Sequence, residues 1–331
     1  MDEGHHRDQQ QEAEAGSVYA AKYRAAGYES AMRLESLDRV GLRALEGALR
    51  AEEPVLLAGT HGAKVPLDEV VPLCHGVLAP ELAEWLAPAA VGGSGLAVSV
   101  VIPTHRHAPI GLAALRGQDV EIELLVLANG DYTEGIRVPW EGHGRTRQRG
   151  VELASHPYVL FTVDDARVLG AGMVRTMVEA LDAGGYDAVV ARQIPWPTAS
   201  EVTRARLRAW TPPGREVVPS AMLDNVCALY RRTALLADPF DAVPIAEDWH
   251  WGRRHRVGYV PTAPVLHSHA RQLRSTFART RDEHRERIVA GEAPRVPDLA
   301  SLLRAAPSTF GRDVRGALGE LLGQYAAARR G

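Results

Sequence analysis

Apolar runs alternate with helical stretches between residues 96 and 170. Leu96–Thr104 and Ile122–Ala128 are rich in β-branched and aliphatic residues, a composition typical of strands buried on both faces of a parallel sheet. A helix is expected between them at about 110–116, which completes a strand–helix–strand unit of roughly 35 residues. A Gly- and Arg-rich segment at 142–150 leads through another helix into a third apolar run at 158–163. The pattern predicts an α/β fold with parallel strands.

The third run ends in two adjacent carboxylates, Asp164 and Asp165. Parallel strands bring their C-terminal ends to one edge of the sheet, where open α/β sheets bind ligands. Two neighbouring carboxylates repel each other unless a cation lies between them. Two interpretations remain open. The acids bind a cation that receives phosphate oxygens, or they open a surface loop and cap a helix that begins near Met173.

The pattern on either side of this region is mainly helical. Apolar residues recur at roughly helical spacing between 19 and 50, which indicates two packed helices, and a short strand is expected at 54–59. The expected organisation is a disordered tail at 1–17, an N-terminal mainly helical extension with its linker at 18–95, the α/β domain at 96–275 and a C-terminal helical tail at 276–331.

Composition narrows the class of protein. The 331 residues are 46% hydrophobic and 24% charged, which is typical of a soluble globular chain, and the net charge of −3 gives no nucleic-acid signature. Only Cys74 and Cys227 are cysteines, so reduced thiols in the cytoplasm are expected. No apolar run approaches the roughly 20 residues of a transmembrane segment. All but two of the 38 basic residues are arginine, a bacterial-type composition rather than a sign of function.

Ordered motifs in the α/β region carry a family resemblance. In sequence they are Val98–Thr104, Leu125–Gly130, Thr146–Gly150, Val163–Asp165, Phe240-Asp241 with Glu247–Arg254, and Val265–His269. Together they resemble the family 2 glycosyltransferases over about residues 96–275. The resemblance implies a GT-A fold, which is Rossmann-like with a mostly parallel sheet flanked by helices. It also implies an inverting, metal-dependent transfer from a nucleoside-diphosphate sugar.

The same resemblance assigns residues to the donor. Asp165 would bind Mn²⁺ or Mg²⁺ with His267 as a second ligand and His269 as a lesser candidate, and imidazole suits Mn²⁺ better. The alternative that remains open is that both histidines lie at the surface, or contact the metal ligands without binding the metal themselves. The residues expected at the nucleotide are Pro103, Thr104, Arg106, Asn129, Asp131, Arg147 and Asp164.

On the acceptor side, Asp248 is the expected general base and Glu247 the residue that orients the site. Inversion in one displacement needs one group that takes the acceptor proton. A carboxylate beside Trp249 would be partly desolvated, which raises its pKa. The alternative is that the acid pair begins a helix and is paired with Arg253 or Arg254.

The segment at 192–219 is rich in Pro, Arg and Trp, so an irregular lid over the donor and acceptor is expected. Trp196, Trp249 and Trp210 would stack on a sugar or an aromatic acceptor, or else anchor the segment to the core. One departure from the family is Ala128, where many relatives have an acid that reads the nucleobase. Asp131 in the following loop could supply that contact.

The expected enzyme is a hexosyl- or deoxyhexosyltransferase whose acceptor is a small molecule, glycan or peptide. A homo-oligomer and contact of the C-terminal helices with a membrane surface remain open. A nucleotidyltransferase is disfavoured, because the chain reads Pro103-Thr104-His105-Arg106 where a Gly-rich phosphate loop would follow the first strand. The rival class is a non-catalytic sugar-nucleotide-binding or scaffold protein with a degenerate GT-A domain.

Overall fold

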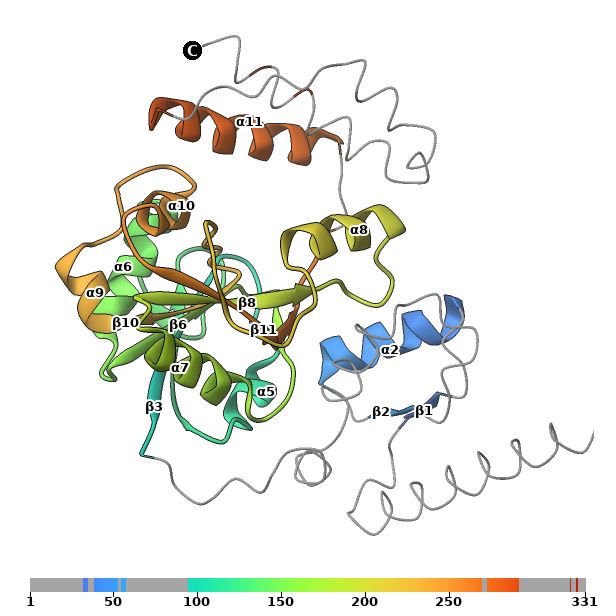
Figure 1. The fold of residues 1–331 in the computed structure, drawn as a ribbon. Helices are drawn as coiled ribbons and strands as arrows, with labels where there is room; N and C mark the ends of the chain where they lie inside the picture. Colours follow the sequence, from blue (N-terminus) through green and yellow to red (C-terminus); the bar gives the residue numbers. More distant parts are fainter. Residues whose placement is uncertain are drawn as a thin grey trace, which may run out of the picture.

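The computed structural model describes residues 32–34, 39–52, 55–57, 95–269 and 273–291, together with positions 322 and 326. The described part is built around one nine-stranded sheet with helices on both faces (Figure 1). The predictions for the N-terminal tail, for residues 58–94 and for the C-terminal helical tail beyond residue 291 lie outside these residues, apart from the two single positions.

The first half of the sheet is parallel. Its order is β5-β4-β3-β6-β10-β8-β11-β7, with β9 paired to β11. The strands β3 (Ala97–Thr104), β4 (Glu121–Ala128), β5 (Ile136–Arg137) and β6 (Tyr158–Thr162) are linked by parallel pairs. The predicted α/β fold is therefore confirmed, and the three apolar runs do end at one edge of the sheet.

The second half of the sheet mixes directions. The strand β10 (Cys227–Arg231) is antiparallel to both β6 and β8 (Ala188–Ile194). The strand β11 (Val257–Leu266) is parallel to β8 and antiparallel to β7 (Arg167–Val168) and β9 (Val218–Pro219). As a result β6, β8 and β11 point the same way, and the start of β10 lies at the edge where they end.

Side chains of β3 alternate between two cores, as the pleat of a strand requires. Val100 belongs to the cluster with Met177 of α7, and Val101 to the cluster with Trp251 of α10. Helices α5 (Leu112–Arg116) and α7 (Met173–Gly184) cover one face, and α6 (His143–Leu153), α9 (Arg232–Ala237) and α10 (Glu247–Gly252) cover the other (Figure 1).

The N-terminal extension packs against the end of the sheet. Helix α2 (Arg39–Ala51) follows β1 (Met32–Leu34), which pairs in parallel with β2 (Val55–Leu57). Leu45 and Leu49 of α2 form a buried cluster with Trp196 and Leu266. The strand expected at 54–59 is confirmed. Of the two helices expected over 19–50, α2 confirms the second. The first lies largely outside the described residues, although residues 32–34 form a strand and not a helix.

The expectation of an irregular segment over 192–219 is wrong. Strand β8 continues to Ile194, and helix α8 (Glu201–Trp210) follows before β9. The Ser200 side chain accepts a hydrogen bond from the Thr203 N–H and so caps the helix. The prolines lie outside α8, where they do not break it. The last described helix is α11 (Leu273–Val289).

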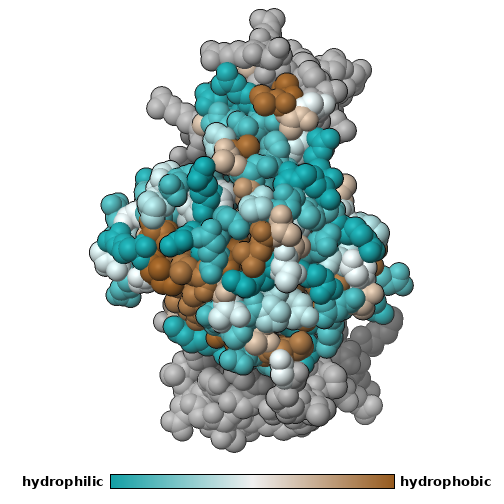
Figure 2. Space-filling view, turned by 90° about the vertical axis from the view of Figure 1, so that its left-hand side faces the viewer, coloured by the Kyte–Doolittle hydropathy of each residue, from teal (hydrophilic) through white to brown (hydrophobic). Residues whose placement is uncertain are grey.

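The surface is mainly hydrophilic on the face shown in Figure 2, with the largest group of hydrophobic residues at the centre left and smaller groups above and below it. Exposed large apolar side chains include Trp140, Trp210 and Leu236. Within the described residues, no helix combines the length and the apolar composition needed to cross a membrane.

Candidate active site

Three residues predicted at the nucleotide lie together at the C-terminal edge of the parallel strands. The Thr104 hydroxyl is 2.9 Å from Asp164 Oδ2 and 2.6 Å from the His107 carbonyl. The Asn129 N–H donates to the Thr104 carbonyl at 3.1 Å. These contacts join the ends of β3, β4 and β6, because each residue follows or completes one of these strands.

The same edge contains a buried polar atom suited to a ligand. Among the described residues, Asn129 Oδ1 has no hydrogen-bond partner although it is buried. Arg106 and Asp131 are exposed in the loops after β3 and β4, and Pro103 is half-buried in β3. A buried amide oxygen rarely stays unsatisfied in a native protein, so Asn129 has capacity for a donor group from outside the chain.

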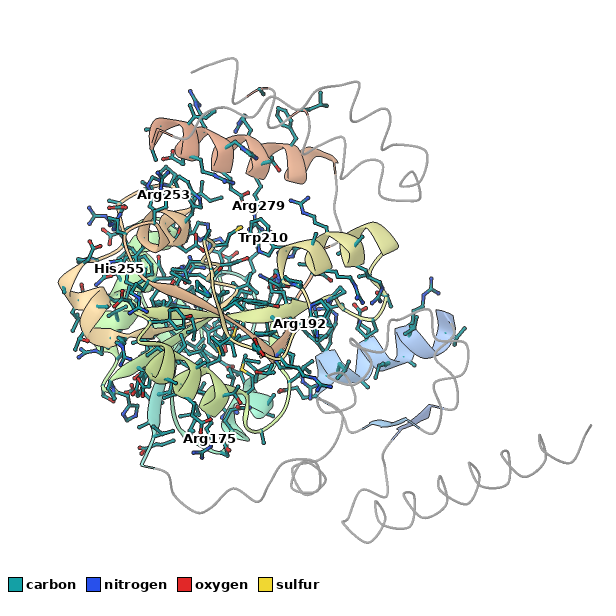
Figure 3. The ribbon with its side chains drawn as sticks, in the orientation of Figure 1. Arg175, Arg192, Trp210, Arg253, His255 and Arg279 are labelled. Carbon is teal, nitrogen blue, oxygen red and sulfur yellow. The ribbon has the colours of Figure 1, made fainter. Side chains whose placement is uncertain are left out.

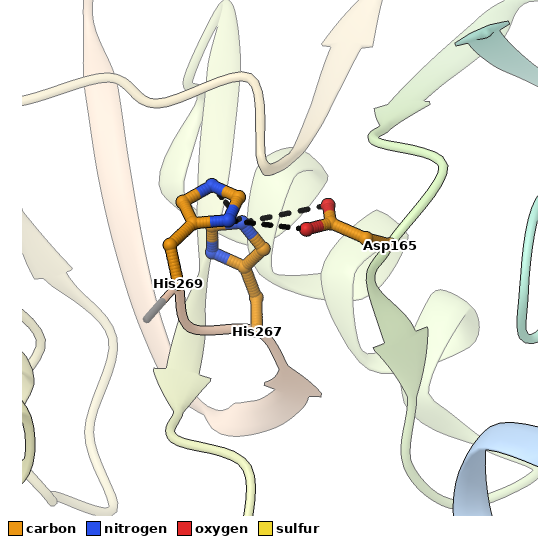
Figure 4. Close-up of side chains that lie close together, drawn as sticks. All are labelled: Asp165, His267 and His269. Carbon is orange, nitrogen blue, oxygen red and sulfur yellow. Dashed lines mark hydrogen bonds and ion pairs between the residues drawn. The ribbon is translucent and has the colours of Figure 1, made fainter. Parts of the chain in front are cut away.

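Asp165 forms a cluster with two histidines from the other half of the sheet (Figure 4). Its Oδ1 is 3.6 Å from His267 Nε2, and its Oδ2 is 3.2 Å from His269 Nδ1. One ligand atom from each residue lies within 4.8 Å of the others. Carboxylate and imidazole donors at this spacing fit a divalent cation such as Mn²⁺.

Gln193 orients the buried histidine. The Gln193 side-chain N–H donates to Asp224 Oδ2 at 2.7 Å, so its Oε1 faces His267 Nδ1 at 3.1 Å. An oxygen acceptor there places the ring proton on Nδ1 and leaves Nε2, which lies 3.2 Å from His269 Nε2, unprotonated and able to bind a cation. Burial lowers the pKa of His267 to about 4, against the opposing charge of Asp165. The imidazole is therefore neutral at pH 7, as a metal ligand must be.

Asp165 is ionised at neutral pH. Burial acts to raise its pKa, but the hydrogen bond from His269 and the charges of both histidines outweigh burial and leave the pKa below its usual value. The alternative that the acid pair caps a helix near Met173 is wrong, because Gly172 is the N-cap of α7.

Glu247 is buried and fixed in place at the start of α10. It is 3% exposed and forms a salt bridge with Arg147 of α6 at 2.5 Å. The Asn225 side-chain N–H donates to the same Glu247 oxygen at 3.2 Å, and Tyr230 donates to Asn225 Oδ1 at 2.7 Å. These contacts fix the Glu247 side chain and pair its charge with that of Arg147.

Within the part of the chain that the structure describes, Asp248 forms no salt bridge. Its Oδ2 accepts the Asn225 N–H at 2.9 Å, and its Oδ1 accepts the Trp249 N–H at 2.8 Å. Burial, followed by the negative charges of Glu247 and Asp224, raises the pKa of Asp248 to about 7. A carboxylate with this pKa exchanges protons efficiently at neutral pH.

The backbone before the acid pair is strained. Ala246 adopts a left-handed conformation with φ 67° and ψ 26°, which costs an alanine about 1–2 kcal/mol. Helix α6 comes very close to the loop that contains Ala246. A Cβ added at Gly144 of α6 would lie 2.7 Å from the Asp241 carbonyl oxygen and 3.2 Å from Glu247 Cβ. The close approach of α6 to this loop brings Arg147 within reach of Glu247, and glycine at 144 permits it.

Two predicted arginine contacts differ from the structure. Arg147 was expected at the nucleobase or diphosphate, but it is 8% exposed and paired with Glu247. Arg254 was a candidate partner of the acid pair, but it binds Asp238 at 2.9 Å and Asp241 at 2.7 Å. The pairing of Glu247 is thus with a helix far away in sequence and not with the next turn of its own helix.

The structure places two of the predicted tryptophans. Trp196 is 2% exposed, and the Arg50 guanidinium lies 4.0 Å from its ring, which agrees with the alternative that it anchors the segment to the core. The Trp249 ring has Arg253 at 4.7 Å and Arg287 at 5.2 Å. These contacts link α10 to α11, and a role of Trp249 on the acceptor side stays a prediction.

Sequence reasoning missed the residues that hold His267, Glu247 and Asp248 in place. They are Gln193 at the end of β8, Asp224 and Asn225 just before β10, and Tyr230 within β10. The only signal was the polar pair Asp224-Asn225 directly before an apolar strand. All of these positions reach the site because β10 starts at the edge where β6, β8 and β11 end.

The sheet and its helices define a GT-A fold. The mannosyltransferase PcManGT from Pyrobaculum calidifontis, solved with GDP-Man and Mn²⁺, has a TM-score of 0.52 with this chain at 16% identity. The match covers 87% of this chain and 98% of that one. At this identity the likeness establishes the fold alone. No family model matches the chain, and the comparison with curated proteins finds no match either.

Two further structures are more distant. TarS from S. aureus, solved with UDP-GlcNAc, has a TM-score of 0.38 at 14% identity, over 56% of this chain and 65% of that one. GalNAc-T7, solved with UDP, GalNAc and Mn²⁺, has a TM-score of 0.37 at 11% identity, over 52% of this chain and 44% of that one. The chain therefore spans less than two thirds of these proteins, and scores below 0.5 do not establish a shared fold.

Proposed function

We propose that this protein is an inverting glycosyltransferase of the family 2 type, which transfers a hexose or deoxyhexose from a nucleoside diphosphate to an acceptor hydroxyl. The observation that carries the proposal is a hydrogen-bonded connection between two carboxylate sites in one GT-A fold. His267 of the Asp165 cluster binds Gln193, and Gln193 binds Asp224. The next residue, Asn225, donates its N–H to Asp248.

Asp248 is the proposed general base. Its carboxylate accepts the proton of the acceptor hydroxyl while the acceptor oxygen forms a bond to the anomeric carbon. The bond from that carbon to the diphosphate breaks, and the diphosphate leaves with the electron pair. A pKa of about 7 leaves a useful fraction of Asp248 ionised at neutral pH and keeps it basic enough to take the proton. Glu247 holds Asp248 in place through α10.

The donor would occupy the edge formed by β3, β4 and β6. Thr104, Asp164 and the unsatisfied Asn129 oxygen are proposed to contact the nucleoside, with Arg106 and Asp131 at the rim of the site. Asp165, His267 and His269 would hold Mn²⁺ or Mg²⁺, which when bound would neutralise charge on the leaving diphosphate.

The proposal includes the cytoplasm as the location. The one free cysteine among the described residues, Cys227, is buried, as expected for a reduced structural thiol.

The direct test is thermal stabilisation by a panel of nucleoside diphosphates and their sugars, with and without Mn²⁺. We expect selective stabilisation by one nucleotide that depends on the metal, of about 2.7 kcal/mol at a ligand concentration 100 times Kd. The donor so found is then incubated with hydroxyl acceptors, and release of nucleoside diphosphate is measured. Binding without release under any acceptor would favour a non-catalytic binder. Absence of binding by every nucleotide would reject the proposal.

The metal site is tested separately by calorimetric titration of Mn²⁺. We expect Asp165→Ala to abolish the metal-dependent stabilisation. His267→Ala should weaken Mn²⁺ binding more than His269→Ala, because the His267 side chain is 7% exposed and oriented by Gln193, whereas that of His269 is 51% exposed. The reverse order would make His269 the main histidine ligand.

A further inference from the structure

A small cavity reaches Asp224, the residue next to the Asn225 whose N–H binds the proposed base. Its volume is about 160 Å³, and its walls include Val190, Trp210, Met222, Asp224 and Tyr259. Trp210 stands at the end of α8, and Figure 3 shows it on the side of the sheet that faces α11. The volume is close to that of the roughly 150 Å³ apolar cavity known to admit benzene, so one six-membered ring fits.

The polar groups around the cavity are already engaged within the protein. The Thr211 hydroxyl donates to the Gln193 carbonyl at 3.1 Å, and the Ser220 hydroxyl donates to the Met222 carbonyl at 2.7 Å. The Tyr259 hydroxyl donates to the Pro212 carbonyl at 2.6 Å, which leaves its ring for the cavity wall.

Because these wall hydroxyls already donate their hydrogen bonds within the protein, a sugar ring is disfavoured as the occupant of the cavity. A hexose carries several hydroxyls, and each one buried without a partner costs about 1–3 kcal/mol. The walls instead present aromatic and aliphatic surface, chiefly from Trp210, Val190 and Met222. An apolar ring gains free energy from that surface without losing hydrogen bonds to water.

Asp224 connects the cavity to the proposed chemistry. It lines the cavity, and its neighbour Asn225 donates its N–H to Asp248 at 2.9 Å. Both Asp224 oxygens are held, one by Gln193 at 2.7 Å and the other by the Val226 N–H at 2.9 Å. Asp224 therefore makes one wall of the cavity acidic, and a hydroxyl substituent on a ring held against Trp210 would face this wall and not the apolar one.

We propose that this cavity is an acceptor subsite that binds the apolar or aromatic ring of a hydroxyl-bearing acceptor. The assignment rests on the proposed transferase function, and it narrows the acceptor from any hydroxyl compound to a ring-bearing alcohol or phenol. The site would select acceptors by the fit of one ring against Trp210, Tyr259 and Met222.

The probe is 4-methylphenol, with methyl glucoside as the sugar comparison, and binding is measured by saturation-transfer NMR with competition. We expect 4-methylphenol to bind and methyl glucoside not to compete with it. Trp210→Ala should weaken binding roughly 2- to 12-fold, since an aromatic pair contributes about 0.5–1.5 kcal/mol beyond its buried area. The matched control is Leu236→Ala on α9, because Leu236 and Trp210 are both 44% exposed.

A second variant tests the cavity independently, in case Trp210→Ala does not fold. Val218→Trp adds bulk at a wall position that is itself 44% exposed, so it should fill the cavity and abolish binding without disturbing the core. Unchanged binding of 4-methylphenol in both variants, or equal binding of methyl glucoside, would overturn the inference. The nucleotide panel separates the two proposals. Ring binding without any nucleotide binding removes the transferase function, and nucleotide binding without ring binding removes only the subsite.

Discussion

Asp165 and Asp248 are both aspartates at one edge of one sheet, but their surroundings give them opposite properties. Two histidines face Asp165, and the pKa of its carboxyl lies below the usual value despite burial. Two acids face Asp248, and its pKa rises to about 7. The first suits a permanently charged ligand of a cation, and the second suits a group that gains and loses a proton. The sign of the neighbouring charges, and not burial alone, separates the two roles.

The two sites also differ in the contacts that hold their side chains in place. On the acid-pair side, Arg147 and Asn225 bind Glu247 in the core, and Tyr230 in turn fixes Asn225. On the metal side, the His267 ring contacts Gln193 and His269, and His269 is itself half exposed. A base must keep one position to accept a proton, whereas metal ligands have a cation to complete their geometry. The comparison therefore predicts different losses. Changes at the acid pair should lower turnover or stability, and changes at the Asp165 cluster should lower metal affinity.

The largest expected effect is on turnover. Asp248→Asn removes the base with little change in shape, so release of nucleoside diphosphate should fall about 10²- to 10⁴-fold. Binding of nucleotide and Mn²⁺ should stay close to that of the unaltered protein, because Asp248 is not one of the three proposed metal ligands and is linked to them only through Asn225, Asp224 and Gln193. The control is Asp241→Asn, the same change at an acid that is 39% exposed and paired with Arg254. Equal losses in the two variants would remove Asp248 from the chemistry.

The next effect concerns stability. Arg147→Met leaves the buried Glu247 charge without its partner, and breaking a buried ion pair in this way costs about 3–5 kcal/mol. Arg149→Met on the same helix breaks an exposed pair with Glu152, whose side chain is 48% exposed, and should cost about 0–1 kcal/mol. Urea unfolding of both variants measures the difference. Similar costs would show that Glu247 is not held by the Arg147 charge.

A smaller effect is expected behind the metal ligands. Gln193→Leu removes the acceptor that orients His267, and loss of such a contact typically weakens metal binding about 10- to 100-fold. The matched control is Gln118→Leu. Gln118 is also buried and hydrogen-bonded, to the Ala114 and Gly170 carbonyls, but it lies on the loop after α5 and contacts none of the three proposed ligands. Calorimetric titration with Mn²⁺ should separate the two variants, and equal affinities would assign Gln193 a structural role only.

The sequence predicted the acids of the proposed sites, but not the residues that hold these acids in position. The strands β3, β4 and β6 were predictable because each is a long apolar run, and the acids at 164–165 and 247–248 interrupt the pattern. The Arg147–Glu247 pair joins residues 100 positions apart, and local sequence carries no sign of such a pairing. Helix α8 was missed because the prolines around it dominate the composition, although they lie outside its ends.

The smallest effect distinguishes the two aspartates by pH. The pKa of Asp248 is about 7 in the folded protein and close to 3.9 in an unfolded chain. Between these values the folded protein keeps a proton that the unfolded chain has released, so this group makes the protein less stable as pH rises from about 4 to about 7. Asp248→Asn removes that dependence. We expect the melting temperature of the unaltered protein to fall relative to that of the variant between pH 4 and pH 8, whatever the variant loses at all pH values because Asn offers one acceptor oxygen where Asp248 uses two. Melting curves across this range provide the measurement. A difference between the two proteins that does not change with pH, or that changes in the opposite sense, would mean that the fold does not disfavour the ionised Asp248, and the contrast between the two sites would then not hold.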